Sequence, residues 1–214
     1  MDDLHDAETY SYASEADPSC TGDYLLPAVT RALAGVPRGA RVFEIGCGNG
    51  VTAKALARLG YDVTAVDTSV SGIEMARLEG ASQCRFEVGS AYDDLAGRFG
   101  TFDAVVSLEV VEHLFSPATF ARTVKALLAE GAPAVISTPY HGYLKNLALA
   151  VMDKWDRHHA PNWEGGHIKF WSRASLRELF ESAGLRETAF LRVGRIAPLA
   201  KSMIGVYRSS EGAG

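Results

Sequence analysis

Residues 44–50, with the sequence EIGCGNG, decide the fold of this chain. They lie between a short apolar run at 41–45 and a helical pattern at 51–59. A side chain at Gly46 or Gly48 would keep the backbone from closing a tight turn and approaching a ligand. The next apolar run is followed by Asp67, whose carboxylate can accept hydrogen bonds from both hydroxyls of a ribose. The loop and the acid together predict a site for a ligand that contains a nucleoside.

Strand and helix patterns alternate on both sides of this loop. Short runs rich in Val and Ile are typical of buried parallel strands; they lie at 41–45, 62–66, 84–88, 103–107 and 133–137. Helices are expected at 24–34, 51–59, 71–79, 116–131 and 172–184. The last runs, 187–193 and 202–207, fit an antiparallel pair. The order predicts an α/β fold, a Rossmann-like three-layer sandwich with a mostly parallel seven-stranded sheet and an antiparallel last strand.

The spacing of the glycines separates the nucleotide-binding families. A dinucleotide dehydrogenase would need a glycine or alanine at position 51, where this chain has Val51, and a phosphate-binding loop would need a Lys-Ser or Lys-Thr pair that does not follow. The Gly-x-Gly-x-Gly spacing behind Glu44 resembles the class I S-adenosylmethionine-dependent methyltransferases. The resemblance implies S-adenosylmethionine (SAM) as cofactor and S-adenosylhomocysteine (SAH) as product.

The resemblance also implies which residues contact this cofactor. They are Glu44, Gly46, Cys47, Gly48 and Asn49 in the glycine loop, Asp67 and Thr68 at the ribose, Gly89, Ser90 and Ala91 at the adenine, and Leu108 and Glu109 at the methionine end. Most members of the family have an acid at or beside the position of Ser90. A serine can still bond the adenine amino group.

A second motif, residues 109–113 (EVVEH), places two carboxylates and an imidazole at i, i+3 and i+4, which share one face of a helical turn. Glu109, Glu112 and His113 would suit Mg²⁺ or another hard or borderline divalent ion. Alternatively, Glu112 and His113 form a hydrogen-bonded pair at a helix start. The motif resembles that of the ubiquinone-biosynthesis O-methyltransferases and of the small-RNA 3′-end 2′-O-methyltransferases, which hold a metal at the substrate oxygen.

Residues 140–167 follow the fifth expected strand and form an insertion rich in aromatic and imidazole groups. A possible helix at 143–156 carries an apolar stripe, and four of the six histidines of the chain lie here: His141, His158, His159 and His167. We expect a substrate lid, because a segment that leaves a parallel strand emerges at the ligand-binding edge. A helix lying on a membrane surface is the second interpretation. Candidate bases are His167, His113 and His141, with His167 preferred.

These observations predict an enzyme that methylates an oxygen of a small aromatic or quinone-like acceptor. The alternatives are methylation of an RNA 3′ end, N-methylation of a small molecule and, least favoured, a cofactor-binding regulator without activity. A net charge of −5 disfavours nucleic acid as a partner. The acidic start of the chain resembles no secretory or transit signal, so we expect a cytoplasmic protein. We divide it into an arm (1–23), a methyltransferase domain (24–208) and a tail (209–214); the sequence leaves the oligomeric state open.

Overall fold

The computed structural model describes residues 21–78, 82–159, 161–162 and 166–209. Within these residues the strands form one seven-stranded sheet of order β3-β2-β1-β4-β5-β7-β6. The parallel strands are β1 (Arg41–Ile45), β2 (Asp62–Asp67), β3 (Cys84–Val88), β4 (Ala104–Leu108) and β5 (Pro133–Pro139). The antiparallel neighbour of β5 is β7 (Ser202–Ser209), which also pairs with β6 (Leu185–Val193). The expected sheet, with its antiparallel last strand, is confirmed.

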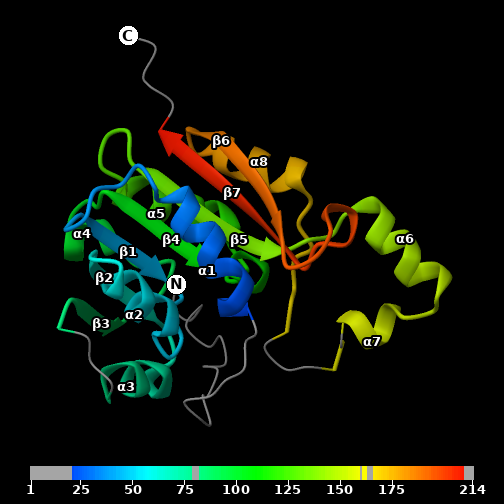
Figure 1. Ribbon diagram of the computed structural model, residues 1–214, viewed down its shortest axis with the longest axis horizontal. Coiled ribbons are helices and arrows are strands. Elements are labelled where there is room, and N and C mark those ends of the chain that lie inside the picture. Colours follow the sequence, from blue (N-terminus) through cyan, green and yellow to red (C-terminus); the bar gives the residue numbers. More distant parts are fainter. Residues whose placement is uncertain (1–20, 79–81, 160, 163–165, 210–214) are drawn as a thin grey trace, which may run out of the picture.

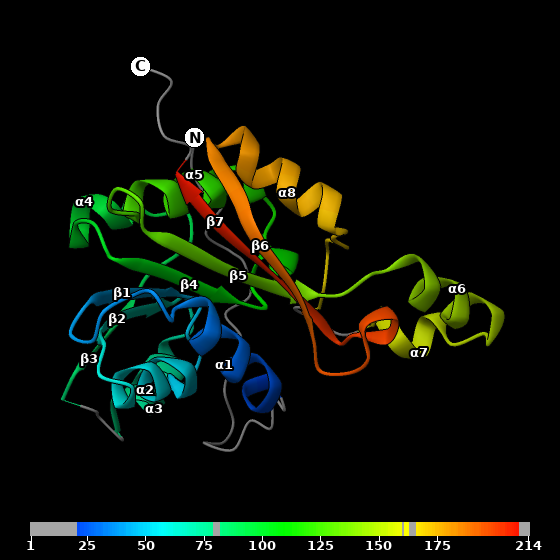
Figure 2. The ribbon, with the colours of Figure 1, turned by 45° about the horizontal axis from the view of Figure 1, so that its top comes forward.

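Helices cover both faces of the sheet, as Figure 2 shows. On one face lie α1 (Thr21–Ala32), α2 (Val51–Arg58) and α3 (Val70–Leu78), which bury Leu25, Leu56 and Ile73 in one core cluster. On the other face lie α4 (Leu95–Phe99), α5 (Pro117–Leu127) and α8 (Arg173–Ser182), which enclose a second cluster around Phe120 and Phe180. The two apolar layers on a shared sheet confirm the three-layer sandwich.

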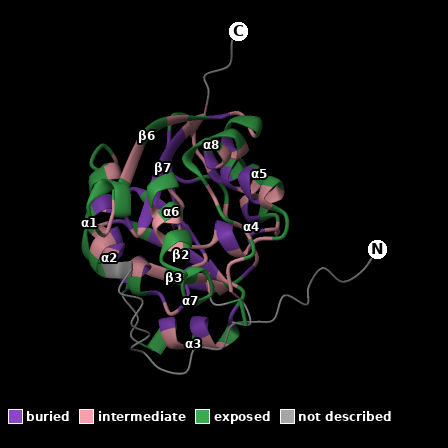
Figure 3. Cartoon of the chain, turned by 90° about the vertical axis from the view of Figure 1, so that its right-hand side faces the viewer, coloured by how far each residue is buried: buried purple, intermediate pink, exposed green. Residues whose placement is uncertain are grey.

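The insertion after β5 forms two helices that project from the body of the domain (Figure 1). They are α6 (Tyr143–Val151) and α7 (Trp155–His159), and neither contains a buried residue, as the colouring of Figure 3 shows. The single helix expected at 143–156 is wrong. Asp153 has a φ of 51°, in the left-handed region, which ends α6 and reverses the chain before α7.

The turn between β6 and β7 carries the short helix η2 (Ala197–Leu199) and lies beside α6 (Figure 2). Among the described helices, none combines the length and apolarity needed to cross a membrane. The expected arm and tail lie almost wholly outside the described residues, since only 21–23 and 209 are described.

Candidate functional site

The carboxyl ends of the parallel strands meet at one edge of the sheet. The strand order reverses between β1 and β4, and ligands of open α/β sheets bind at such a point. The loops after β1, β2 and β3 supply the expected cofactor residues, and those after β4 and β5 begin with Glu109 and Tyr140. All the sequence-predicted segments therefore reach the same edge.

The glycine loop is held by the strand beside it and by Asp67. The N–H of Gly46 donates to the carbonyl of Val66 (2.8 Å), and with a φ of 78° a side chain at Gly46 would collide with Val110. The Asp67 carboxylate accepts from the N–H of Gly48 (2.7 Å) and of Ser69 (2.8 Å). Asp67 thus shapes the loop, and its contact with the ribose stays a prediction.

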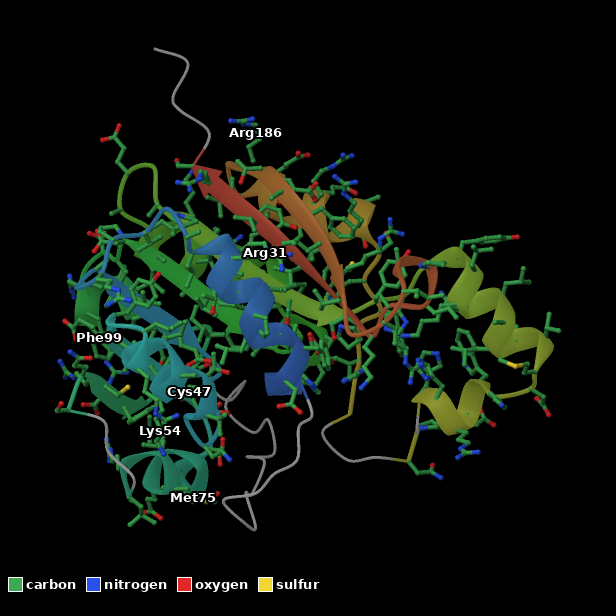
Figure 4. The ribbon with its side chains drawn as sticks, viewed as in Figure 1. Arg31, Cys47, Lys54, Met75, Phe99 and Arg186 are labelled. Atoms are coloured by element: carbon green, nitrogen blue, oxygen red, sulfur yellow. The ribbon has the colours of Figure 1, made fainter. Side chains whose placement is uncertain are left out.

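Glu44 and Cys47 lie buried beneath this loop. Burial, together with the nearby Asp67, raises the pKa of Glu44 to about 8, and within the described residues its Oε2 has no hydrogen-bond partner. A buried acid with an orphaned oxygen suits a ligand that brings a cation, such as an amino group. Cys47, labelled in Figure 4, is also buried, and burial raises the pKa of its thiol well above the usual range, so it is a packing residue rather than a nucleophile.

The loop after β3 forms a closed turn. The N–H of Gly89 donates to the carbonyl of Asp67 (3.0 Å), which joins this loop to the ribose side. The Ser90 hydroxyl accepts from the N–H of Tyr92 (3.2 Å), and the N–H of Ser90 donates to Asp93 (2.9 Å). Asp93 therefore shapes this turn, a role that the sequence reasoning missed.

The remaining expected cofactor residues line the same edge with differing exposure. Ala91 is buried, Leu108 and Asn49 are half-buried, and Thr68 is exposed. Leu108 packs against the core cluster beneath α1 and α2. Their positions agree with the expected pocket. Their contacts with the cofactor stay predictions.

Glu109 lies where β4 ends, with a φ of 55°. Because its backbone is left-handed, Glu109 does not share a helical face with Glu112 and His113, contrary to what the sequence pattern predicted. Its carboxylate accepts from the hydroxyls of Ser137 (2.6 Å) and Ser202 (3.0 Å). Burial raises the pKa of Glu109 to about 7. Ser202, 93 positions away in the chain, was not anticipated, because only the antiparallel insertion of β7 brings it here.

Three ligand-type side chains gather beside Glu109: Glu112 and His113 from the short helix η1 (Val111–His113), and His167 from the far end of the insertion. Their nearest N and O atoms all lie within 4.8 Å of one another. Glu112 is 1% exposed, and neither of its carboxylate oxygens has a hydrogen-bond partner in the described part of the chain. Nε2 of His167 lies 4.0 Å from Oε1 of Glu112. We call this group the Glu112–His113–His167 cluster.

The electrostatics of this cluster suit a bound cation. Burial, and then the neighbouring Glu109, raise the pKa of Glu112 well above its usual range. Burial and His113 lower the pKa of His167 to about 4, so its ring is neutral at pH 7. Nδ1 of His113 lies 3.3 Å from the carbonyl of Gly166, which can only accept, so Nδ1 is the donor in this hydrogen bond. A buried carboxylate with two imidazoles is a donor set for a borderline divalent ion.

Backbone hydrogen bonds fix His167 in this position. The N–H groups of Ile168 and Lys169 both donate to the carbonyl of Glu112 (3.0 Å each), and Nε1 of Trp171 donates to the carbonyl of Val111 (3.3 Å). The segment that ends the insertion is thereby attached to η1, and the sequence could not show this pairing.

His141 belongs to a separate group of rings. It stacks on His159 (5.6 Å between centroids), and both rings contact Phe170 edge-on. Burial and Lys145 lower the pKa of His141 to about 4. The three candidate bases are therefore split between two places, His113 and His167 in the cluster and His141 at the root of the insertion.

Comparison with known proteins shows which family the chain belongs to. A family model described as a methyltransferase domain matches residues 19–189. The chain belongs to this methyltransferase family. Over 116 residues it is 43% identical to a ubiquinone biosynthesis O-methyltransferase of Caulobacter sp. (strain K31). The matched segment covers 52% of this chain and 45% of that relative. Over 159 residues it is 40% identical to the enzyme of the same description from Xanthomonas campestris pv. campestris (strain B100), covering 69% and 66%. The chain thus spans about half to two thirds of the length of these curated relatives.

The fold also matches solved methyltransferases. The magnesium protoporphyrin IX methyltransferase of Synechocystis PCC 6803 with bound SAH superposes with a TM-score of 0.67, at 19% identity, over 87% of this chain and 82% of the other chain. At that identity the likeness is one of fold. The resemblance to class I methyltransferases drawn from the glycine loop is confirmed at the level of the family.

Proposed function

We propose that this methyltransferase uses SAM to methylate a hydroxyl oxygen of a small aromatic or quinone-like acceptor. The observation that carries the proposal is the Glu112–His113–His167 cluster, which stands beside the cofactor loops at the edge where the strand order reverses. The two relatives named above, both ubiquinone biosynthesis O-methyltransferases, support an oxygen acceptor.

The residues present fit the cofactor. Asp67 would bind the ribose hydroxyls while it holds the glycine loop, and the orphaned oxygen of Glu44 would meet the positive charge of the methionine end. SAM supplies a methyl group that is already activated for displacement. The protein must then mainly hold the acceptor in line, exclude water and take up a proton.

The pKa values divide these tasks among the acidic and imidazole groups. With a pKa of about 4, His167 and His141 are neutral but weakly basic at pH 7, which suits His167 to ligation better than to proton transfer. Glu109, with a pKa of about 7, matches the pH at which a base works best. We therefore assign proton uptake to Glu109 in preference to His167, the candidate that the sequence analysis preferred.

A divalent ion fits the cluster. Glu112, His113 and His167 would hold it, whereas Glu109 is already hydrogen-bonded to two serine hydroxyls and stands beside this set. A bound Mg²⁺, Mn²⁺ or similar ion would lower the pKa of an acceptor hydroxyl and fix its angle.

Transfer of labelled methyl groups tests the proposal. The protein is incubated with methyl-labelled SAM and catechol, with an amine analogue, or with an RNA that has a free 3′-terminal 2′-hydroxyl, and the products are identified by mass spectrometry. Methyl ether formation on the catechol supports the proposal. Label on the RNA or the amine alone would replace it with one of the alternatives, and SAH binding without any transfer would favour a regulator.

The insertion at 140–167 is proposed as a lid over the acceptor. Peripheral membrane contact through 143–156 is the second candidate, favoured by apolar side chains with large exposed fractions, namely Tyr143 (78%), Leu144 (57%), Val151 (78%) and Met152 (52%). Figure 4 shows side chains of α6 that point away from the body of the domain. Co-sedimentation with anionic and with zwitterionic vesicles, using Val151→Asp as the variant, tests this contact.

A further inference from the structure

A chain of hydroxyl groups runs from α1 into the site and ends on the carboxylate of Glu109. The Tyr24 hydroxyl lies 3.1 Å from Oγ of Ser202, which is 178 positions away in the sequence. Oγ of Ser202 donates to Oε2 of Glu109 (3.0 Å), and Oγ of Ser137 donates to Oε1 (2.6 Å). We call Tyr24 and Ser202 the hydroxyl chain. It connects α1 to the residue that follows β4.

The hydrogen bonds of the hydroxyl chain all point toward the carboxylate. A serine hydroxyl has a single hydrogen, and Ser202 donates it to Glu109, so the hydrogen between Tyr24 and Ser202 comes from the phenol. Nζ of Lys201 lies 5.1 Å from the centre of the Tyr24 ring, and the attraction between a cation and a ring face helps to hold the phenol in place. Successive hydrogen bonds in one direction polarise one another, so Tyr24 acts on Glu109 through Ser202.

The hydroxyl chain and Ser137 together hold both oxygens of the Glu109 carboxylate. Ser137 and Ser202 are buried (0% and 1% exposed) and lie on the paired strands β5 and β7, which give these donors a rigid support. An ionised carboxylate has about four acceptor positions, so the two serine hydroxyls leave others for a bound molecule. The hydroxyls therefore fix the direction of the carboxylate without using all of its acceptor positions.

We propose that Tyr24 is a positioning residue for methyl transfer, which acts through the Ser202 hydroxyl to fix the Glu109 carboxylate at the acceptor. The inference rests on the proposed function, in which Glu109 takes up the proton of the acceptor hydroxyl, and it adds α1 to the elements that build the site. In this role Tyr24 contacts neither the acceptor nor the cofactor. Its loss should therefore lower kcat and leave the affinity for both unchanged.

The kinetics of SAM-dependent methylation of catechol test this inference. We measure kcat and KM for the intact protein, for Tyr24→Phe, which keeps the ring beside Lys201, and for Ser202→Ala. We expect kcat to fall about threefold or more in Tyr24→Phe and about tenfold in Ser202→Ala, because the second variant loses a hydrogen bond to the carboxylate itself. Ser202→Thr keeps a hydroxyl and should retain a kcat within about threefold of the wild type. KM for catechol and the affinity for SAH should stay within about twofold throughout.

Two comparisons separate positioning from a purely structural role. Tyr61→Phe is the matched control, because the Tyr61 hydroxyl donates to the carbonyl of Leu33, just beyond the C-terminal end of α1 (3.3 Å), and its kcat should equal that of the wild type. The double variant Tyr24→Phe/Ser202→Ala should have the kcat of Ser202→Ala alone, because the effect of Tyr24 passes through the Ser202 hydroxyl. Multiplied effects in the double variant, equal effects in Tyr24→Phe and Tyr61→Phe, or weaker SAH binding in Tyr24→Phe overturn the inference.

A stability measurement separates this inference from the proposed function. If the intact protein does not methylate catechol, the proposed function fails, and urea unfolding of Tyr24→Phe, Glu109→Gln and the double variant then decides on the hydroxyl chain. We expect the unfolding equilibrium constant of the double variant to differ about threefold or more from the product of the two single effects, because members of one hydrogen-bond network are coupled. Such coupling supports the action of Tyr24 on Glu109. A simple product of the two single effects overturns the inference.

Discussion

Replacing Glu112 with Gln separates a cation-binding role from a folding role. Burial and then Glu109 hold the pKa of Glu112 well above its usual range, which favours the uncharged, protonated carboxyl when no cation is bound. Gln has nearly the same shape as a protonated carboxyl and no charge. We therefore expect Glu112→Gln to change the free energy of unfolding of the metal-free protein by less than about 1 kcal/mol, although the side chain is 1% exposed.

The same substitution should remove the response to a divalent ion. A ligand at one hundred times its Kd stabilises the folded state by about 2.7 kcal/mol. For a chain of this length each kcal/mol raises Tm by about 2–4 °C, so saturating Mn²⁺ should raise the wild-type Tm by about 5–10 °C. In Glu112→Gln the rise should shrink to about 2 °C or less, because one of three ligands is lost.

Differential scanning calorimetry with and without Mn²⁺, Mg²⁺ or a chelator measures both effects. Glu74→Gln, which changes an exposed acid on α3, is the matched control and should keep the full rise. Methyl transfer measured on the same samples should fall strongly in Glu112→Gln, while SAH affinity stays within a few-fold. A wild-type protein that responds to none of these ions, or a variant that responds in full, refutes the cluster as a metal site.

Three further predictions follow from the buried groups and the insertion. The pKa of Glu44 is about 8 against an ordinary 4.5, so its contribution to stability is complete below about pH 4.5 and is lost as the pH rises toward 8. The free energy of unfolding of Glu44→Gln relative to wild type, measured by urea unfolding, should therefore increase from pH 4.5 to 8. A difference that stays constant over this window contradicts the pKa shift. His141 and His167, with pKa values lowered from 6.5 to about 4, contribute stability above pH 6.5 that is lost as the pH falls toward 4. The amide protection factors at 140–167 should therefore decrease in that window, and protection factors that do not change with pH would exclude this. Exchange of 140–167 should slow when SAH and a catechol are both bound, and equal exchange in the ternary complex speaks against a lid.

Local features of the sequence were enough for the glycine loop and the sheet. Gly46, Gly48 and Asp67 lie close together in space because each lies at or just beyond the carboxyl end of a parallel strand, and these ends share one edge of the sheet. The short α4 was not predicted, since five residues give too little periodicity to recognise. The break at Asp153 was missed because its left-handed backbone carries no glycine signal.

The candidate site depends on contacts that no spacing in the sequence reveals. Glu109 was placed on a helical face because i, i+3 and i+4 residues share one in a regular helix, but its left-handed backbone turns it toward Ser137 and Ser202 instead. His167 joins Glu112 only because backbone hydrogen bonds attach residues 168 and 169 to η1. Such tertiary pairings require the three-dimensional arrangement of distant segments.

The most direct test of the account is a calorimetric titration of SAH into the metal-free protein and into Asp67→Ala. The central claim is that the loops after β1 and β2 hold the cofactor, with the Asp67 carboxylate both accepting from the N–H of Gly48 and Ser69 and facing the ribose. The account predicts that the wild-type protein binds SAH without added metal and that Asp67→Ala weakens this binding by about 1–3 kcal/mol, the range for a lost charge-assisted hydrogen-bond partner. No binding to the wild type, or equal affinity in the variant, would contradict it.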